Sequence, residues 1–194
     1  MPRRRRIPGG TGLLALLCVL QAAAFVEESA EVSFHGRSYA YRFTAVLDAP
    51  LDAVSTVVTD YDRLARLNDS ITESRELSRS GEHALRRLLA LRQCLLLFCF
   101  DMRFVEDVVI APEEKLTVIR TAVVPAESSF RDGVAEWRLE ALSSSRSRMT
   151  LSATQTPDFW IPPVIGPLVL QRVFVREVRE TTGNIERLAA AIAP

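Results

Sequence analysis

Apolar and polar residues alternate over residues 39–47, which predicts a β-strand with one apolar face. The apolar positions of this strand are Tyr39, Tyr41, Phe43, Ala45 and Leu47. After Asp48-Ala49-Pro50 the apolar residues take a helical spacing over 51–58. Asp60 is a candidate N-cap for a second short helix. The pattern therefore predicts one strand followed by two short helices.

The next long alternating region, residues 84–110, exceeds the ~3–10 residues of a typical strand. Its alternation is good before Gln93 and again after Phe100, but it is lost between Cys94 and Cys99. We therefore expect the chain to turn between the two cysteines. A strand at 71–80 precedes this region, with a hairpin turn at 80–82. Three more strands are expected at 116–123, 131–142 and 147–156, and a long helix at 164–191.

Short turns join these strands, so they should pair antiparallel. The resulting fold class is α+β: a sheet of about six to seven strands whose apolar face is covered by the long C-terminal helix. No repeat or linker interrupts residues 33–192, which predict one domain.

The first 24 residues have the layout of a secretory signal peptide. A basic region, Arg3 to Arg6, precedes an apolar stretch that begins at Leu13, and Ala22-Ala23-Ala24 supplies small residues for cleavage. The apolar stretch spans about 14 residues, whereas a membrane span needs ~20. We expect a cleaved signal peptide over 1–24 and a periplasmic or secreted protein, with an N-terminal membrane anchor as the alternative.

Charge and composition narrow the classes of function. The 24 basic and 24 acidic residues cancel, which disfavours a nucleic-acid binder. Two histidines and three cysteines are too few for a His/Cys metal cluster. Lys115 is the one lysine, and it lies in no phosphate-binding motif. We expect no metal and no cofactor.

Four local motifs appear in a recognisable order: Ala49-Pro50 with Val54, Asp60-Tyr61, Trp137 with Leu139, and the aromatic loop Pro157–Pro163. Together they resemble the START-like (SRPBCC) superfamily, in particular its polyketide cyclase and coenzyme Q-binding branch. The resemblance covers about residues 36–190 and implies a helix-grip fold. It also implies a cavity for a hydrophobic ligand between the sheet and the last helix.

The candidate ligand pocket consists of apolar residues expected on the inner face of the sheet or near the last helix. They are Phe43, Phe100, Met102, Phe104, Trp137, Met149, Leu151, Phe159, Trp160 and Leu168. The alternation around Trp137 places it on the cavity side, because Ala135 and Leu139 form the less charged set. Phe159 and Trp160 are also candidates for a transient contact with a membrane or a protein, since exposed aromatic residues commonly mark contact surfaces.

Three polar residues, Arg120, Glu136 and Gln155, are candidates for polar groups in the pocket, with an outward orientation as the alternative. Asp101, Glu106 and Asp107 are assigned to the solvated face of a strand, and His35 and His83 to the surface. The sequence contains no nucleophile-elbow motif. We identify no catalytic residue.

Cys94 and Cys99 are candidates for a disulfide, because an exported protein meets an oxidising compartment. A straight strand would hold them ~16 Å apart on opposite faces, whereas a disulfide needs Cα atoms within ~7 Å. The bond therefore depends on the expected turn. The alternative is two buried free thiols.

Three hypotheses of function remain. The first is binding or transport of a hydrophobic small molecule such as a lipid or quinone. The second is a cyclase or dehydratase that uses the same pocket, which an inward-facing polar pair such as Arg120 and Glu136 within hydrogen-bond reach would favour. The third is a protein-interaction module with a filled core.

Overall fold

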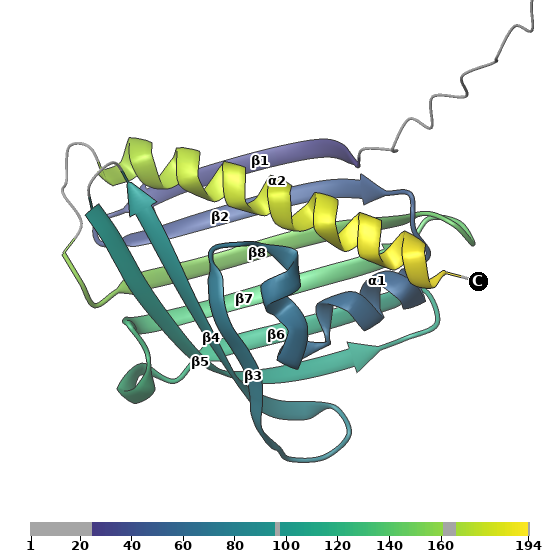
Figure 1. Cartoon of the computed structure of the whole chain (residues 1–194), viewed down its shortest axis with the longest axis horizontal. Helices are drawn as coiled ribbons and strands as arrows, with labels where there is room; N and C mark the ends of the chain where they lie inside the picture. The colour runs from purple at the N-terminus through teal and green to yellow at the C-terminus, as the bar shows by residue number, and fades with distance from the viewer. Residues whose placement is uncertain (1–24, 96–97, 161–165, 194) are drawn as a thin grey trace, which may run out of the picture.

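The computed structural model describes residues 25–95, 98–160 and 166–193. Eight strands form one antiparallel sheet in the order β1-β2-β8-β7-β6-β5-β4-β3. The strands are β1 (Val26–His35), β2 (Ser38–Leu47), β3 (Ile71–Arg79), β4 (Ala84–Leu95), β5 (Phe98–Pro112), β6 (Leu116–Val123), β7 (Phe130–Ala141) and β8 (Ser147–Pro157). Figure 1 shows this sheet curving beneath one long helix.

The helices of the described residues lie in three places along the chain: after β2, between β6 and β7, and after β8. The α-helix α1 (Leu51–Val58) and the 3₁₀-helix η1 (Tyr61–Leu67) follow β2. The short 3₁₀ turn η2 (Pro125–Glu127) follows β6, and the long α-helix α2 (Gly166–Ile192) follows β8. None of the helices in the described segments combines the length and the apolar character that a membrane crossing requires. The α+β class, the antiparallel sheet and the long C-terminal helix are confirmed.

One strand was not predicted. β1 pairs with β2 and carries an irregularity between Glu27 and Ser29 that shifts its register. This irregularity interrupts the alternation by which β1 could have been recognised. The sheet therefore has eight strands rather than six or seven.

The reversal expected between the two cysteines is confirmed, because β4 and β5 pair antiparallel and place Cys94 directly opposite Cys99. The hairpin turn between β3 and β4 is confirmed as well. Gly81 in that turn has φ +119°, a backbone conformation that residues with a Cβ avoid.

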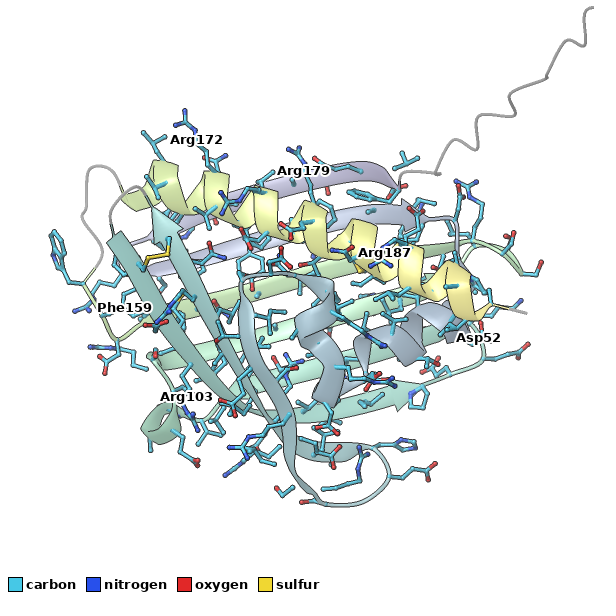
Figure 2. All side chains as sticks on the ribbon, viewed as in Figure 1. Asp52, Arg103, Phe159, Arg172, Arg179 and Arg187 are labelled. Atoms are coloured by element: carbon cyan, nitrogen blue, oxygen red, sulfur yellow. A yellow bond between two sulfur atoms is a disulfide. The ribbon has the colours of Figure 1, made fainter. Side chains whose placement is uncertain are left out.

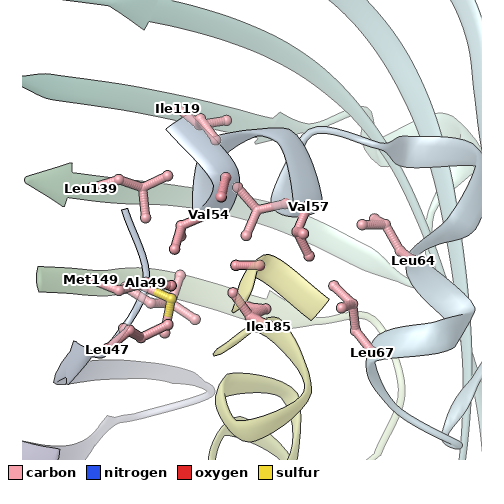
Figure 3. Close-up of a cluster of buried hydrophobic side chains, with 14 of the residues drawn as sticks. Leu47, Ala49, Val54, Val57, Leu64, Leu67, Ile119, Leu139, Met149 and Ile185 are labelled. Carbon is pink, nitrogen blue, oxygen red and sulfur yellow. The ribbon is translucent and has the colours of Figure 1, made fainter. Parts of the chain in front are cut away.

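The core lies where α1 and the second half of α2 pack on the inner face of the sheet. Val54 and Val57 of α1 meet Ile185 of α2 above Leu139 and Met149 of the sheet, and all five side chains are fully buried. Figure 3 shows this packing. The first half of α2 contributes less to it, since Leu168 is 60% exposed.

Candidate functional site

A cavity of about 210 Å³ lies between the sheet, η1 and the middle of α2. Its walls are mainly apolar and come from strands, η1 and α2 together. The apolar lining includes Leu64, Leu67, Leu89, Leu91, Ile119, Trp137, Leu151, Phe174 and Val178. Ligand sites in proteins are typically concave and apolar with a few polar groups, and this cavity has that composition.

A buried ion pair lies on the same inner face. The Arg87 Nε donates to Glu106 Oε2 at 2.9 Å, and Arg87 Nη2 lies 2.8 Å from the same oxygen. Thr121 Oγ1 donates to Glu106 Oε1 at 3.0 Å. The two charged side chains are only 10% and 5% exposed. Arg87 lines the cavity, so the pair places a positive charge at the wall of an apolar chamber.

The register of two strands produces this pair. Arg87 of β4 lies opposite Glu106 of β5, and both occupy inward positions, since Leu85 and Val108 on the same face are buried. Burial alone lowers the pKa of Arg87, but the Glu106 carboxylate and the neighbouring Tyr61 outweigh it and raise that pKa. The guanidinium therefore stays charged inside the protein.

Two tyrosines line the cavity beside this pair. The Arg87 guanidinium carbon lies 5.1 Å from the centre of the Tyr61 ring, within the range of a cation–π contact. Burial raises the pKa of Tyr61 and of Tyr41, and the Glu106 carboxylate adds to the rise at Tyr41. Both phenols are therefore neutral at physiological pH and can donate a hydrogen bond. The Tyr61 hydroxyl is buried without a hydrogen-bond partner among the described residues.

Two asparagines hold η1 against α2 at the roof of the cavity. Asn68 Nδ2 donates to the Glu177 carbonyl and to Thr181 Oγ1, each at 3.2 Å. Asn184 Nδ2 donates to the Leu67 carbonyl at 3.1 Å. These bonds satisfy polar groups at the end of η1, and they join the two elements that would have to separate if the cavity opened on this side.

Of the ten predicted pocket residues, two line the cavity. Trp137 and Leu151 do so, which confirms the inward register predicted for Trp137. Phe43 and Met149 are instead fully buried core residues. They lie on the correct face of the sheet, but at positions where the core fills the space.

The other aromatic candidates form a separate group near the end of β5. Phe104 stacks on Phe130 with ring centres 4.3 Å apart, and Phe159 lies 5.7 Å from Phe130. Phe100 stacks on Phe159 at 6.5 Å, and Met102 lies with Phe100 and Phe159 along a surface hollow. Figure 2 shows Phe159 at the end of the molecule away from the C-terminus. This group packs β5 against the loop after β8 and does not line the cavity.

Trp160 and Leu168 do not line the cavity either. Their side chains are 73% and 60% exposed. Residues 161–165, which include part of the proline loop, lie outside the described residues. The surface placement of His35 and His83 is confirmed, since both are exposed.

The polar candidates divide between the two faces. Gln155 is buried on the inner face and accepts a hydrogen bond of 2.5 Å from the Tyr39 hydroxyl. Arg120 and Glu136 do not face the pocket. They form a 2.9 Å ion pair on the outer face, with side chains 60% and 35% exposed, because each lies one position from an inward residue and strand side chains alternate.

The assignment of Glu106 to the solvated face was wrong, although Asp101 and Asp107 are exposed as predicted. Glu106 has the same parity as Phe104 and Val108, so strict alternation would have placed it inside. Arg87, Tyr61 and Asn68 were missed as cavity residues. The sequence contained a comparable indication for Arg87. It lies an even number of positions from Leu85, Leu89 and Leu91, so alternation places it on the same face of the strand.

The structure joins Cys94 and Cys99 through a disulfide, visible as the yellow bond at the upper end of β4 and β5 in Figure 2. It bridges neighbouring strands at the tip of their hairpin, away from the ion pair. Its position supports a structural role.

A curved antiparallel sheet that grips a C-terminal helix around an internal cavity defines a helix-grip protein of the START-like class. The chain belongs to the polyketide cyclase / dehydrase and lipid transport family, which residues 40–190 match. No curated protein matches the chain significantly.

Solved structures share this fold at low sequence identity. Human StAR-related lipid transfer protein 5 superposes with a TM-score of 0.67 at 10% identity, over 86% of this chain and 89% of that one. The Zhui aromatase/cyclase from Streptomyces sp. R1128 gives 0.60 at 14% identity, over 80% and 96%. A STAR-related lipid transfer protein fragment from Xanthomonas axonopodis gives 0.58 at 13% identity, over 84% and 97%.

Proposed function

We propose that this protein binds a hydrophobic small molecule, such as a lipid or a quinone, in the cavity beneath α2. The cavity itself carries the proposal, because it is apolar and of about 210 Å³. The names of the human and Xanthomonas structures, both lipid transfer proteins, support it. A protein-interaction module with a filled core, the third hypothesis, is not expected to contain such a cavity.

The volume limits the ligand. An engineered dry cavity of about 150 Å³ holds benzene, whereas drug-sized sites span about 300–1,000 Å³. The cavity therefore suits a ring system or part of an acyl chain. A larger lipid requires η1 and α2 to move apart, which breaks the bonds of Asn68 and Asn184.

The wall of the cavity also favours one polar group on the ligand. The Arg87 guanidinium is held by Glu106, and the Tyr61 hydroxyl beside it lacks a partner among the described residues. A carbonyl or hydroxyl oxygen of the ligand would accept a hydrogen bond from Tyr61. The preferred ligand is thus amphipathic, with its oxygen directed toward Arg87 and Tyr61.

Two tryptophan variants test the site. Leu91→Trp places a large side chain at the cavity wall, and Val109→Trp places the same side chain on the outer face, where Val109 is 52% exposed. We expect Leu91→Trp to weaken binding of a fluorescent fatty acid probe at least about tenfold, while Val109→Trp leaves it unchanged. Equal binding by both variants, with the fold retained by circular dichroism, would show that the probe does not use this cavity.

The ligand itself can be sought by native mass spectrometry of the protein purified from its own cell envelope. A co-purified lipid or quinone supports carriage, and its loss in Leu91→Trp but not in Val109→Trp assigns it to the cavity. A ligand that persists in both variants contradicts the assignment.

A cyclase or dehydratase is the second candidate, because an inward polar pair within hydrogen-bond reach favours it and Arg87–Glu106 is such a pair. In that reaction Glu106, whose oxygens bond Arg87 and Thr121 and which does not itself line the cavity, would have to turn into the cavity to accept a proton from a carbon next to a carbonyl group, while Arg87 and Tyr61 stabilise the developing oxyanion. The test is deuterium uptake by a cyclic ketone in D₂O, followed by NMR. Uptake that Glu106→Gln abolishes, at a temperature where circular dichroism shows this destabilised variant to be folded, supports catalysis, and no uptake above the buffer rate supports binding alone.

We also propose that the protein is exported to the periplasm or beyond. The signal-peptide pattern of residues 1–24 supports this location, and so does the disulfide, since such bonds persist mainly in oxidising compartments. N-terminal sequencing after cell fractionation tests it. A full-length chain in the membrane fraction would instead support the N-terminal anchor.

We also propose a transient contact with a membrane or a protein through the exposed side chain of Trp160. Phe159 packs against Phe130 and Phe100, so the proposed contact depends on Trp160 rather than on both aromatic residues. Loss of vesicle or partner binding in Trp160→Ser, with probe binding unchanged, would support it.

A further inference from the structure

A buried carboxylate on α2 lacks a cationic partner among the described residues. Glu186 is 5% exposed and forms no ion pair within the described part of the chain. Its Oε1 accepts a 2.8 Å hydrogen bond from the backbone N–H of Asp48. The Asp48 carboxylate does not compensate it, because that group is itself negative and pairs with Arg146. A buried charge with no counter-ion is unfavourable and calls for an explanation.

The backbone N–H of Phe25 also faces Glu186, where burial raises the pKa of the carboxyl group and this N–H lowers it. Phe25 is held in place by its side chain, whose ring lies 6.3 Å from that of Phe43 in an edge-on arrangement. The same ring lies against α2, with one edge carbon 3.7 Å from where a Cβ on Gly183 would stand. The nitrogen atom of Phe25 is therefore fixed beside the Glu186 carboxylate.

Phe25 is also the residue that follows Ala22-Ala23-Ala24, the small-residue pattern at the end of the signal peptide. Hydrolysis of the Ala24–Phe25 peptide bond by a signal peptidase consumes one water molecule. It leaves a carboxylate on Ala24 and an amino group on Phe25, which binds a proton at neutral pH.

We propose that signal-peptide cleavage before Phe25 creates the cation that Glu186 lacks, so that the new α-ammonium group and the buried carboxylate form an ion pair. Before cleavage, the Phe25 nitrogen offers Glu186 one N–H and no charge. After cleavage the same nitrogen offers three N–H donors and a positive charge. Burial raises the pKa of Glu186 in the uncleaved arrangement, and the adjacent cation favours its ionised form.

This inference rests on the proposed export and is independent of ligand binding. Glu186 is then the ion-pair partner of the amino terminus of the mature protein. Removal of the signal peptide therefore stabilises the contact between β1 and α2. Arg179 and Glu27, which pair nearby between the same two elements at 2.6 Å, already satisfy each other and supply no charge to Glu186.

The experiment uses the full chain, exported with its own signal peptide, in four test forms and two control forms. The first two forms are the parent chain and a variant with Ser-Gly inserted between Ala24 and Phe25. The insertion moves the new amino group two residues away from Phe25, and so away from Glu186. The second pair carries the same difference in a Glu186→Gln background. The glutamine oxygen can still accept the bond from the Asp48 N–H, so this variant removes the charge and keeps that contact. Intact mass gives the first residue of each mature protein.

We expect the insertion to lower Tm by about 3–6 °C in the parent chain and by less than about 1 °C in Glu186→Gln. Glu31→Gln, which removes an exposed carboxylate from β1, is the matched control and should preserve the full effect of the insertion. An equal loss in both backgrounds would overturn the ion pair, and so would no loss in the parent. A mature chain that starts at another residue would overturn the cleavage site.

A chemical readout does not depend on the Glu186 variant. Lys115, the one lysine of the chain, is exposed and serves as an internal reference for amine acylation. Relative to Lys115, the amino terminus of the parent should react at least about tenfold more slowly than that of the Ser-Gly form, because the ion pair withholds its lone pair. Equal relative rates would contradict the proposal.

Discussion

The Arg87–Glu106 pair allows a quantitative test of burial, because the same sheet carries the same pair of residue types on its outer face. Arg87 and Glu106 are 10% and 5% exposed, and Arg120 and Glu136 are 60% and 35% exposed. The N–O distances are nearly equal, at 2.8 and 2.9 Å. Glu106→Gln and Glu136→Gln therefore remove the same charge from two pairs that differ mainly in their access to water.

Glu106→Gln leaves Arg87 charged at the wall of a mainly apolar cavity, without its carboxylate partner. Losing one partner of a buried pair costs about 3–5 kcal/mol, whereas exposed pairs contribute about 0–1 kcal/mol. In a domain of this size 1 kcal/mol shifts Tm by about 2–4 °C, so Glu106→Gln should lower Tm by about 6–20 °C. Glu136→Gln should lower it by less than about 4 °C. Denaturant unfolding monitored by tryptophan fluorescence provides both free energies.

Equal losses in the two variants would refute this reasoning and show that Arg87 finds compensation elsewhere in the cavity. The double replacement Arg87→Met with Glu106→Leu is a further check. Apolar replacement of a whole buried pair is often neutral or stabilising, so the double variant should be more stable than Glu106→Gln alone. It should also weaken any preference for a ligand oxygen without abolishing it, because the Tyr61 hydroxyl remains.

Three further predictions concern other parts of the molecule. Burial raises the pKa of Tyr39 and of Tyr41 above the ordinary value of 10.0. Their phenolate absorbance should therefore stay absent in the folded protein at pH values where free tyrosine ionises, and their contribution to stability should be constant below pH ~10 and fall above it, as the unfolded phenols release protons. Trp137→Ala should cost about 2 kcal/mol, less than the 3–5 kcal/mol of a fully buried tryptophan, because one side of the ring already borders a cavity; calorimetry and probe binding together check this. Replacing Cys94 and Cys99 by serine should cost about 2 kcal/mol, as expected for a short loop. In the unreduced, denatured mature protein neither cysteine should react with iodoacetamide, and two reactive thiols would rule the bond out.

Local alternation predicted much of the fold, because it reports which face of a strand is apolar. It located β2, β7 and β8, the inward register of Trp137 and the reversal between Cys94 and Cys99. It failed for β1, where an irregular register between Glu27 and Ser29 breaks the period.

The polar part of the cavity was harder to predict for a physical reason. A charged residue at an inward position is tolerated only when a partner lies opposite it, and Arg87 and Glu106 become partners through a register that depends on the whole hairpin. If that register is not known, an unpaired Glu106 carboxylate is expected on the outer face, where water solvates it. Similarly, alternation could not show that Phe43 and Met149 lie under α1 and the buried half of α2, whereas Trp137 lies beside the cavity.

The unequal burial of α2 along its length has an evolutionary consequence. Its C-terminal part, with Ile185 and Ala189, belongs to the filled core, so substitutions there are constrained by the stability of the whole domain. Over the cavity, around Phe174 and Thr181, a change of side-chain size alters an existing space more than it disrupts close packing. Ligand preference can therefore diverge at one end of the helix while the other end preserves the fold. Structures named as a lipid transfer protein and as an aromatase/cyclase share this fold at 10% and 14% identity to the chain.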